Sequence, residues 1–149
     1  MTDVEALLDA AAADGISKLV VGAVVHAHGK VLILRRSTSD DFLPGIEELP
    51  SGGPDPGEDL MAALARELAE EIGWTGQMSV DPGFVATFDY VSGSGRRARQ
   101  ITFSLAYDGP ITLSNEHTSY RWVRPDQTGG TDLTPESVRT IQAWAESRS

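Results

Sequence analysis

The sequence predicts an α/β domain in which a mixed β-sheet lies between helices. Segments rich in β-branched and apolar residues recur along the chain, and the first, 18–27, is apolar almost without interruption, as in a strand buried on both faces. A segment with helical spacing of apolar residues, 59–72, interrupts this run of strands, and another, 135–147, follows it. Strands and helices that alternate in this way pack as layers around one core.

The length and charge of the chain limit the kinds of partner it can have. Its 149 residues are about one ordinary domain. It carries 12 Lys and Arg against 22 Asp and Glu, a net charge of −10, which argues against a nucleic-acid polymer as partner. A small phosphorylated substrate is still compatible with this charge, because a bound divalent cation reverses the local sign.

Three absences in the sequence limit chemistry and location. The chain has no cysteine, which excludes a disulfide framework, a thiolate metal site and a cysteine nucleophile. No apolar run reaches the roughly 20 residues of a membrane span. The acidic start of the chain lacks the basic region of a signal peptide. We therefore expect a cytoplasmic protein without a membrane partner.

The segment 1–16 is expected to form a helical extension, ended by Asp14-Gly15, in front of the main domain 17–149. Its apolar positions follow helical spacing and carry no chemistry. We therefore expect this helix to pack against the domain or to form a homodimer contact. The strand 18–27 is expected to turn at His28-Gly29 and to return as a second strand over 31–34.

Two arginines, Arg35 and Arg36, close the second strand. Arginine at a strand end can hold a phosphate in a bidentate fork. The alternative is a solvated pair that balances nearby acids. The histidines His26 and His28 lack a third metal ligand and are interpreted as residues of a strand end or turn.

The segment Gly52–Trp74 concentrates charge beside a predicted core. At about 100° per residue, Glu71 lies roughly 40° from Glu67 on the helix, and Glu70 roughly 60° away on the other side. The neighbouring strip is apolar, so the three acids border a buried surface. Like charges at this spacing repel each other. A hard cation such as Mg²⁺ explains them, because it binds carboxylate oxygens together with substrate phosphates.

The same segment follows a named pattern, the Nudix box, which here consists of Gly52, five residues, Glu58, seven residues, Arg66-Glu67-Leu68, one residue, Glu70-Glu71, one residue, Gly73 and the bulky apolar Trp74. The sequence therefore resembles a Nudix hydrolase over about residues 17–147. The resemblance implies a Nudix-type α/β/α sandwich around a mixed β-sheet. It also implies Mg²⁺, with Mn²⁺ as a substitute, as the cofactor.

The resemblance further implies the roles of individual residues. Metal ligands would be Glu67, Glu70, Glu71 and the main-chain carbonyl of Ser51, which stands where the family usually has glycine. Arg66 would orient a metal-binding glutamate, with Glu58 in a similar role. Glu116, shortly before a strand, would supply a further carboxylate or act as base. Substrate contacts are expected from Arg35, Arg36 and the loop glycines Gly52 and Gly53.

The rest of the chain is expected to complete the sheet. We predict a strand over 78–90 with a break at Asp81-Pro82-Gly83, a hairpin tip at 92–95, and return strands over 100–107 and 120–123. The basic segment 96–99 is either a solvated loop or a lid over the substrate.

The expected function is Mg²⁺-dependent hydrolysis of a nucleoside diphosphate linked to another moiety, most simply of a nucleoside triphosphate to the monophosphate and pyrophosphate. Nucleotide sugars, dinucleoside polyphosphates and oxidised nucleotides are alternative substrates, and the sequence leaves open which glutamate is the general base. A nucleotide-sensing domain without catalysis is the other class, although such relatives commonly lose box glutamates. The related isoprenoid diphosphate isomerases rely on a cysteine and are set aside.

Overall fold

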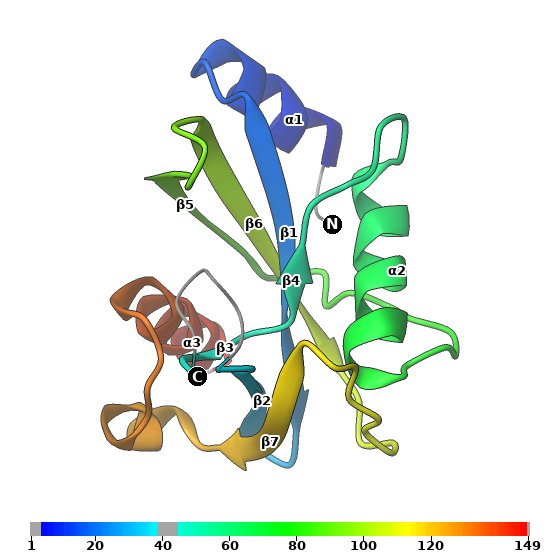
Figure 1. Ribbon diagram of the computed structural model, residues 1–149, viewed down its shortest axis with the longest axis vertical. Coiled ribbons are helices and arrows are strands. Elements are labelled where there is room, and N and C mark those ends of the chain that lie inside the picture. Colours follow the sequence, from blue (N-terminus) through cyan, green and yellow to red (C-terminus); the bar gives the residue numbers. More distant parts are fainter. Residues whose placement is uncertain (1–3, 39–44, 149) are drawn as a thin grey trace.

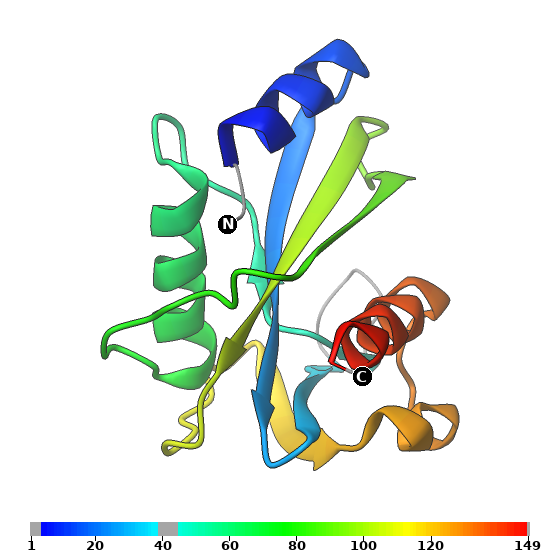
Figure 2. The same cartoon turned by 180° about the vertical axis from the view of Figure 1, so that it is seen from behind.

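The computed structural model describes residues 4–38 and 45–148. Seven strands form one mixed sheet, in which β3-β2-β1-β6-β5 is the main order, β4 pairs with β1, and β7 pairs with β2. Helix α2 covers one face and α3 the other, which Figure 1 and the reverse view in Figure 2 both show. The predicted α/β sandwich around a mixed sheet is therefore confirmed. Its elements are α1 Val4–Ala13, β1 Lys18–Ala27, β2 Lys30–Arg36, β3 Glu47–Glu48, β4 Ser51–Gly52, α2 Leu60–Ile72, β5 Val85–Val91, β6 Arg97–Ala106, β7 His117–Val123, a 3-10 helix Pro125–Gly130 and α3 Pro135–Ser147.

Strand β1 lies at the centre of the sheet, parallel to β6 and antiparallel to β2. Alternate residues serve two apolar cores. Val21, Ala23 and Val25 pack in the cluster that includes α2, and Val24 belongs to the cluster that includes Ile141 of α3. Burial on both faces explains why this strand is apolar almost throughout.

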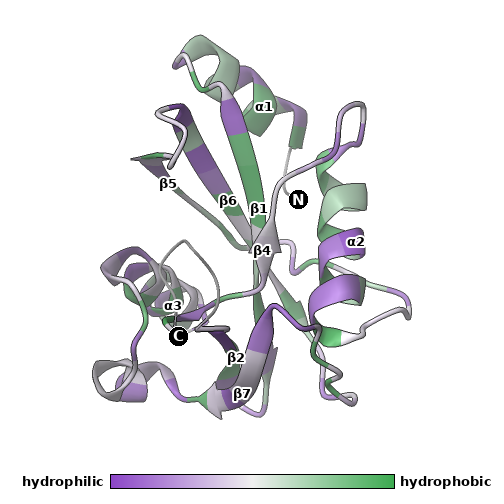
Figure 3. Ribbon diagram, viewed as in Figure 1, coloured by the Kyte–Doolittle hydropathy of each residue, from purple (hydrophilic) through white to green (hydrophobic). Residues whose placement is uncertain are grey.

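Helix α2 begins and ends where the sequence predicts. The side chain of Asp59 accepts a hydrogen bond from the backbone N–H of Ala62 at 2.7 Å and caps the helix. Gly73 follows with φ of 78°, the left-handed conformation of a C′ glycine. The first turns are apolar and the later turns, beside β4, are hydrophilic in Figure 3. The helix thus holds its acidic residues next to β4 of the sheet.

The structure differs from the expected elements in several places. The strand predicted over 78–90 is confined to Val85–Val91, because the chain turns at Pro82-Gly83, within the predicted break. Before this turn, Asp81 binds His26 and Ser104 through its side chain at 2.7 Å each. The strands β3 and β4 and the 3-10 helix were not predicted, since two to six residues show no periodicity. Residues 1–3 of the expected N-terminal extension lie outside the described residues. No helix in the described part of the chain is long and apolar enough to cross a membrane.

Candidate active site

A cavity of about 420 Å³ opens between the loop before α2, the sheet and the start of α3. Acidic and imidazole side chains reach it from α2, β3 and the start of β7, whereas aromatic and amide side chains reach it from β5 and β6. The residues of greatest chemical interest in its wall are Arg36, Glu48, Ser51, Gly52, Gly53, Glu71, Phe88, Tyr90, Gln100, Glu116 and His117. The cavity thus combines charged and planar apolar surface.

Glu71 is the most deeply buried acid of the helix, with 3% of its surface exposed. It accepts a hydrogen bond from the backbone N–H of Ser51, while its Oε2 has no partner among the described residues. Burial, and after it the charges of Glu67, Glu48 and Glu116, raise its pKa to about 9. Without a bound cation, the folded protein therefore favours the protonated, uncharged form of Glu71.

Glu67 lies over the backbone of the loop, and its carboxylate occupies the space that a Cβ atom on Gly52 would need. Burial raises its pKa, and contact with Arg66 works in the opposite direction. The guanidinium of Arg66 donates to Glu67 at 2.8 Å, to Glu58 at 2.9 Å and to the carbonyl of Gly53 at 2.9 Å. Arg66 thereby ties the loop to the helix and fixes the position of Glu67. These contacts are compatible with its predicted positioning role.

Glu70 is not part of the cavity wall. Its side chain is 58% exposed and lies 3.4 Å from the guanidinium of Arg66. The structure therefore places Glu71 and Glu116 in the cavity wall, whereas Glu67 and Glu70 are not part of that wall. Metal ligation by Glu70 and by the carbonyl of Ser51 stays a prediction.

The two arginines at the end of β2 separate. Arg35 donates to the carbonyl of Gly45 at 2.7 Å and to Asp132 at 3.0 Å, and lies 3.4 Å from Glu47. It is not in the cavity wall. Arg36 is, and its guanidinium lies 3.6 Å from Glu48. Of the two arginines, Arg36 alone lines this cavity, and substrate contact by either residue stays a prediction.

Glu47 explains the position of Arg35. Although 2% exposed, it binds Arg121 through hydrogen bonds of 2.7 and 2.8 Å and accepts one from the backbone N–H of Asp132 at 2.9 Å. Burial tends to raise its pKa, but Arg121, this backbone N–H and Arg35 outweigh burial and hold the pKa below its usual value. This ion cluster, in which Glu47 is buried and the arginines are partly exposed, joins β2, β3 and β7.

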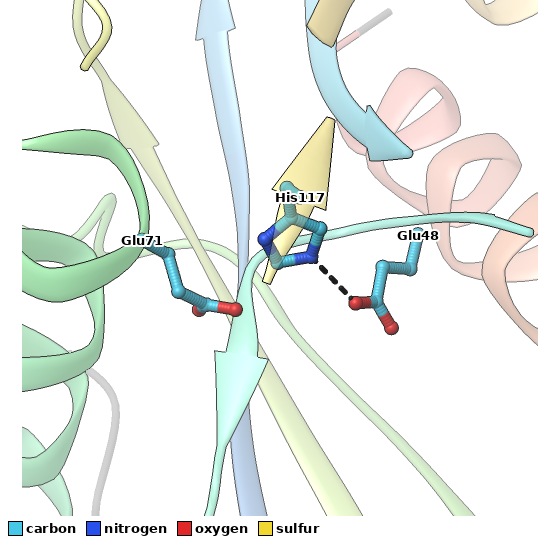
Figure 4. A group of neighbouring side chains, drawn as sticks. All are labelled: Glu48, Glu71 and His117. Atoms are coloured by element: carbon cyan, nitrogen blue, oxygen red, sulfur yellow. Dashed lines mark hydrogen bonds and ion pairs between the residues drawn. The ribbon is translucent and has the colours of Figure 1, made fainter. Parts of the chain in front are cut away.

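Glu48 and His117 had no assigned role in the sequence prediction. His117 is 5% exposed, its Nε2 lies 2.8 Å from a carboxylate oxygen of Glu48, and its Nδ1 has no partner among the described residues. One ligand atom each from Glu48, Glu71 and His117 lies within 4.8 Å of the others (Figure 4). The only sequence signal for His117 was its place directly after Glu116.

A family model described as the NUDIX domain matches residues 17–144. The chain belongs to the Nudix hydrolase family. It is 30% identical over 126 residues to the uncharacterized Nudix hydrolase YfcD of Salmonella typhi, covering 81% of this chain and 66% of that relative, so this chain spans about two thirds of its length. It is 26% identical over 140 residues to the nucleoside triphosphatase NudI of Salmonella arizonae, covering 84% and 94% of the two chains. Its fold is similar to that of the MutT protein from Methanosarcina mazei Go1, with a TM-score of 0.76, 26% identity and coverage of 89% and 95%.

Members of the Nudix family generally use divalent metal ions, and the side chains of this Nudix hydrolase fit one. Glu71 carries a buried oxygen without a partner, and three further carboxylates raise its pKa. A cation would supply the missing partner and offset the clustered charge. Of the predicted ligands, Glu71 belongs to the group whose ligand atoms lie within 4.8 Å of one another, together with Glu48 and His117. Metal ligation by Glu67 and Glu116 stays a prediction.

Proposed function

We propose that this Nudix hydrolase is a Mg²⁺-dependent pyrophosphohydrolase that converts a nucleoside triphosphate to the monophosphate and pyrophosphate. The observation that carries the proposal is one cavity with a carboxylate cluster on one side and a planar apolar and amide surface on the other. A nucleotide has the same two parts, a phosphate chain and a base. The similarity to NudI, which is named a nucleoside triphosphatase, supports a triphosphate as the first choice.

The base would lie on the sheet. Gln100 of β6 is paired in register with Val20 of β1 on one side and with Phe88 of β5 on the other, and all three line the cavity. Tyr90 extends this row, with its ring centroid 5.9 Å from that of Phe88. Aromatic rings offer a stacking surface for a base. An amide adds both a donor and an acceptor for its edge.

Gln100 is held in place by its neighbours. Its Nε2 donates to Thr102 Oγ1 at 3.3 Å, and its side chain crosses Gly22, where a Cβ atom would come within 2.7 Å of Nε2. A glycine at this point of β1 therefore makes room for the amide. A fixed amide discriminates between bases because the wrong edge leaves its polar atoms unpaired.

The phosphates would lie over the carboxylates. Mg²⁺, or Mn²⁺ in its place, would neutralise the diphosphate and lower the pKa of the attacking water when bound. Glu71, Glu67 and Glu116 hold the charge that attracts it, and Arg66 keeps Glu67 in position. Arg36 is placed in the cavity wall to contact a phosphate oxygen. The proton of the attacking water would pass to Glu67 or Glu116, which a comparison of the pH–rate profiles of Glu67→Gln and Glu116→Gln distinguishes.

The test is pyrophosphate and phosphate release from a panel of nucleoside triphosphates, nucleotide sugars and dinucleoside polyphosphates, with Mg²⁺ and with chelator. Glu71→Gln should lower turnover by about 100-fold or more, because it removes a charge expected to bind the metal. Glu5→Gln on the exposed surface of α1 is the charge-matched control and should change nothing. Turnover of nucleotide sugars but not of triphosphates would contradict a triphosphate as the substrate and identify nucleotide sugars instead. Nucleotide binding without any turnover would instead identify a sensor.

A further inference from the structure

The pair Glu48–His117 has the form of a carboxylate–histidine unit. A carboxylate only accepts hydrogen bonds, so Nε2 of His117 is the donor in its 2.8 Å contact with Glu48. A neutral imidazole with hydrogen on Nε2 carries a lone pair on Nδ1. The other carboxylate oxygen of Glu48 lies 3.6 Å from the guanidinium of Arg36. The pair therefore presents Nδ1 as a bare acceptor.

That acceptor points toward a second one. In Figure 4, Nδ1 lies on the side of the His117 ring that faces Glu71, opposite the side bonded to Glu48. Nδ1 and Oε2 of Glu71 are both buried without a partner among the described residues. His117 is 5% and Glu71 3% exposed, and both side chains line the cavity of the candidate active site. A cation that displaces the proton from Glu71 would give both Nδ1 and Oε2 a partner.

The backbone gives His117 this orientation. Strand β7 pairs with β2 as Arg35↔Ser119 and then Arg36↔His117, which skips Thr118 and marks a β-bulge. A bulge reverses the alternation of side chains and turns one toward a new direction. Here it brings the buried His117 and Arg36 into the same cavity wall.

We propose that His117 donates Nδ1 to a divalent cation shared with Glu71, and that Glu48 orients the imidazole through Nε2. The inference rests on the metal site of the proposed function and adds a nitrogen ligand to its oxygens. Metal-binding histidines typically donate their other N–H to a carboxylate in this way. A nitrogen donor favours Mn²⁺ and Co²⁺ over Mg²⁺, which prefers oxygen alone.

The test is electron spin-echo spectroscopy of Mn²⁺ bound to the metal-stripped full chain. Unlabelled wild-type protein should show modulation from a coordinated ¹⁴N, and labelling of histidine with ¹⁵N should replace it by the ¹⁵N pattern. This comparison needs no variant and so does not depend on a variant folding. Bound Mn²⁺ without nitrogen coupling, or no bound Mn²⁺, would overturn the proposal.

Variants then assign the nitrogen to one histidine. His117→Gln should abolish the nitrogen coupling and weaken Mn²⁺ binding by about 10- to 100-fold, with a smaller effect on Mg²⁺. His26→Gln removes another buried histidine, one held by Asp81, and should leave both unchanged. An unchanged ratio of Mn²⁺ to Mg²⁺ affinity in His117→Gln contradicts the inference.

The same measurements separate the inference from the proposed function. Nitrogen-coordinated Mn²⁺ without turnover of any nucleotide would contradict the proposed pyrophosphohydrolase activity and support His117 as a metal ligand. Turnover with Mn²⁺ bound by oxygen ligands alone would support the pyrophosphohydrolase activity and contradict His117 as a metal ligand.

Discussion

The carboxylate of Glu67 fills the place of the missing side chain at Gly52. A Cβ atom there would overlap the carboxyl group, whereas one on the next residue, Gly53, would have its nearest neighbour, the carbonyl of Leu19, at 3.6 Å. Gly52 therefore lets the half-buried Glu67 approach the backbone of the loop. Neither glycine has a positive φ, so the difference between them is one of space alone.

We expect Gly52→Ala to lower kcat by about 100-fold, because the added methyl displaces Glu67, and misplacement by about 1 Å costs this much at an active site. Gly53→Ala adds the same methyl where it fits and should keep at least a tenth of the wild-type kcat. Turnover assays with circular dichroism as a check of folding make the comparison. Equal losses in the two variants would contradict the role given to Gly52.

The positions of Arg35 and Arg36 predict that loss of Arg35 affects stability, whereas loss of Arg36 affects substrate binding. Arg35→Ala removes a partner of the buried Glu47 and should lower the free energy of unfolding by about 1 to 3 kcal/mol, with KM unchanged. Arg36→Ala removes a cation from the cavity wall and should raise the KM for a triphosphate about 10-fold, with a smaller effect on stability. Urea denaturation and steady-state kinetics test both. A raised KM in Arg35→Ala would indicate that Arg35 contacts the substrate after all.

The sequence predicted what depends on local patterns and missed what depends on distant pairing. Helix α2 was predictable because its cap, its apolar strip and Gly73 lie within one segment. Glu48 and His117 meet only because β3 and β7 pair with opposite edges of β2, which joins residues 69 positions apart. No local pattern encodes such a meeting. Likewise, both arginines of Arg35-Arg36 looked alike until the structure showed which of them Glu47 binds.

The raised pKa of Glu71 predicts how stability depends on pH in the metal-free protein. Its pKa is about 9 in the folded chain and near the ordinary 4.5 when unfolded. Between these values the folded state holds a proton that the unfolded state has lost, so the free energy of unfolding falls as pH rises. Denaturation in chelator at pH 5, 7 and 8.5 should show this decline, and Glu71→Gln should reduce it. A wild-type curve that rises through this range would contradict the assignment.

Metal binding should have the opposite pH dependence. The cation binds ionised Glu71, so its binding releases a proton and its affinity should rise with pH up to about 9. Calorimetric titration of Mg²⁺ at pH 6.5 and 8 in buffers of different ionisation enthalpy measures both affinity and proton release. Glu71→Gln should release less than half as many protons. Full proton release in that variant would show that another group titrates.

Gln100 should decide which base is accepted. Gln100→Leu keeps the size of the side chain but removes the donor and acceptor, while the aromatic surface of Phe88 and Tyr90 remains. We expect kcat/KM for the preferred nucleotide to fall by about 10- to 100-fold and the preference among bases to weaken, because only hydrogen bonds distinguish their edges. Thr102→Val removes the group that holds the amide and should produce a milder form of the same change. The matched control is Gln142→Leu, whose amide binds the carbonyl of Pro125 at 2.7 Å and is not in the cavity wall. If Gln100→Leu lowers kcat/KM equally for every base, its amide contributes to catalysis or folding and the base is read elsewhere.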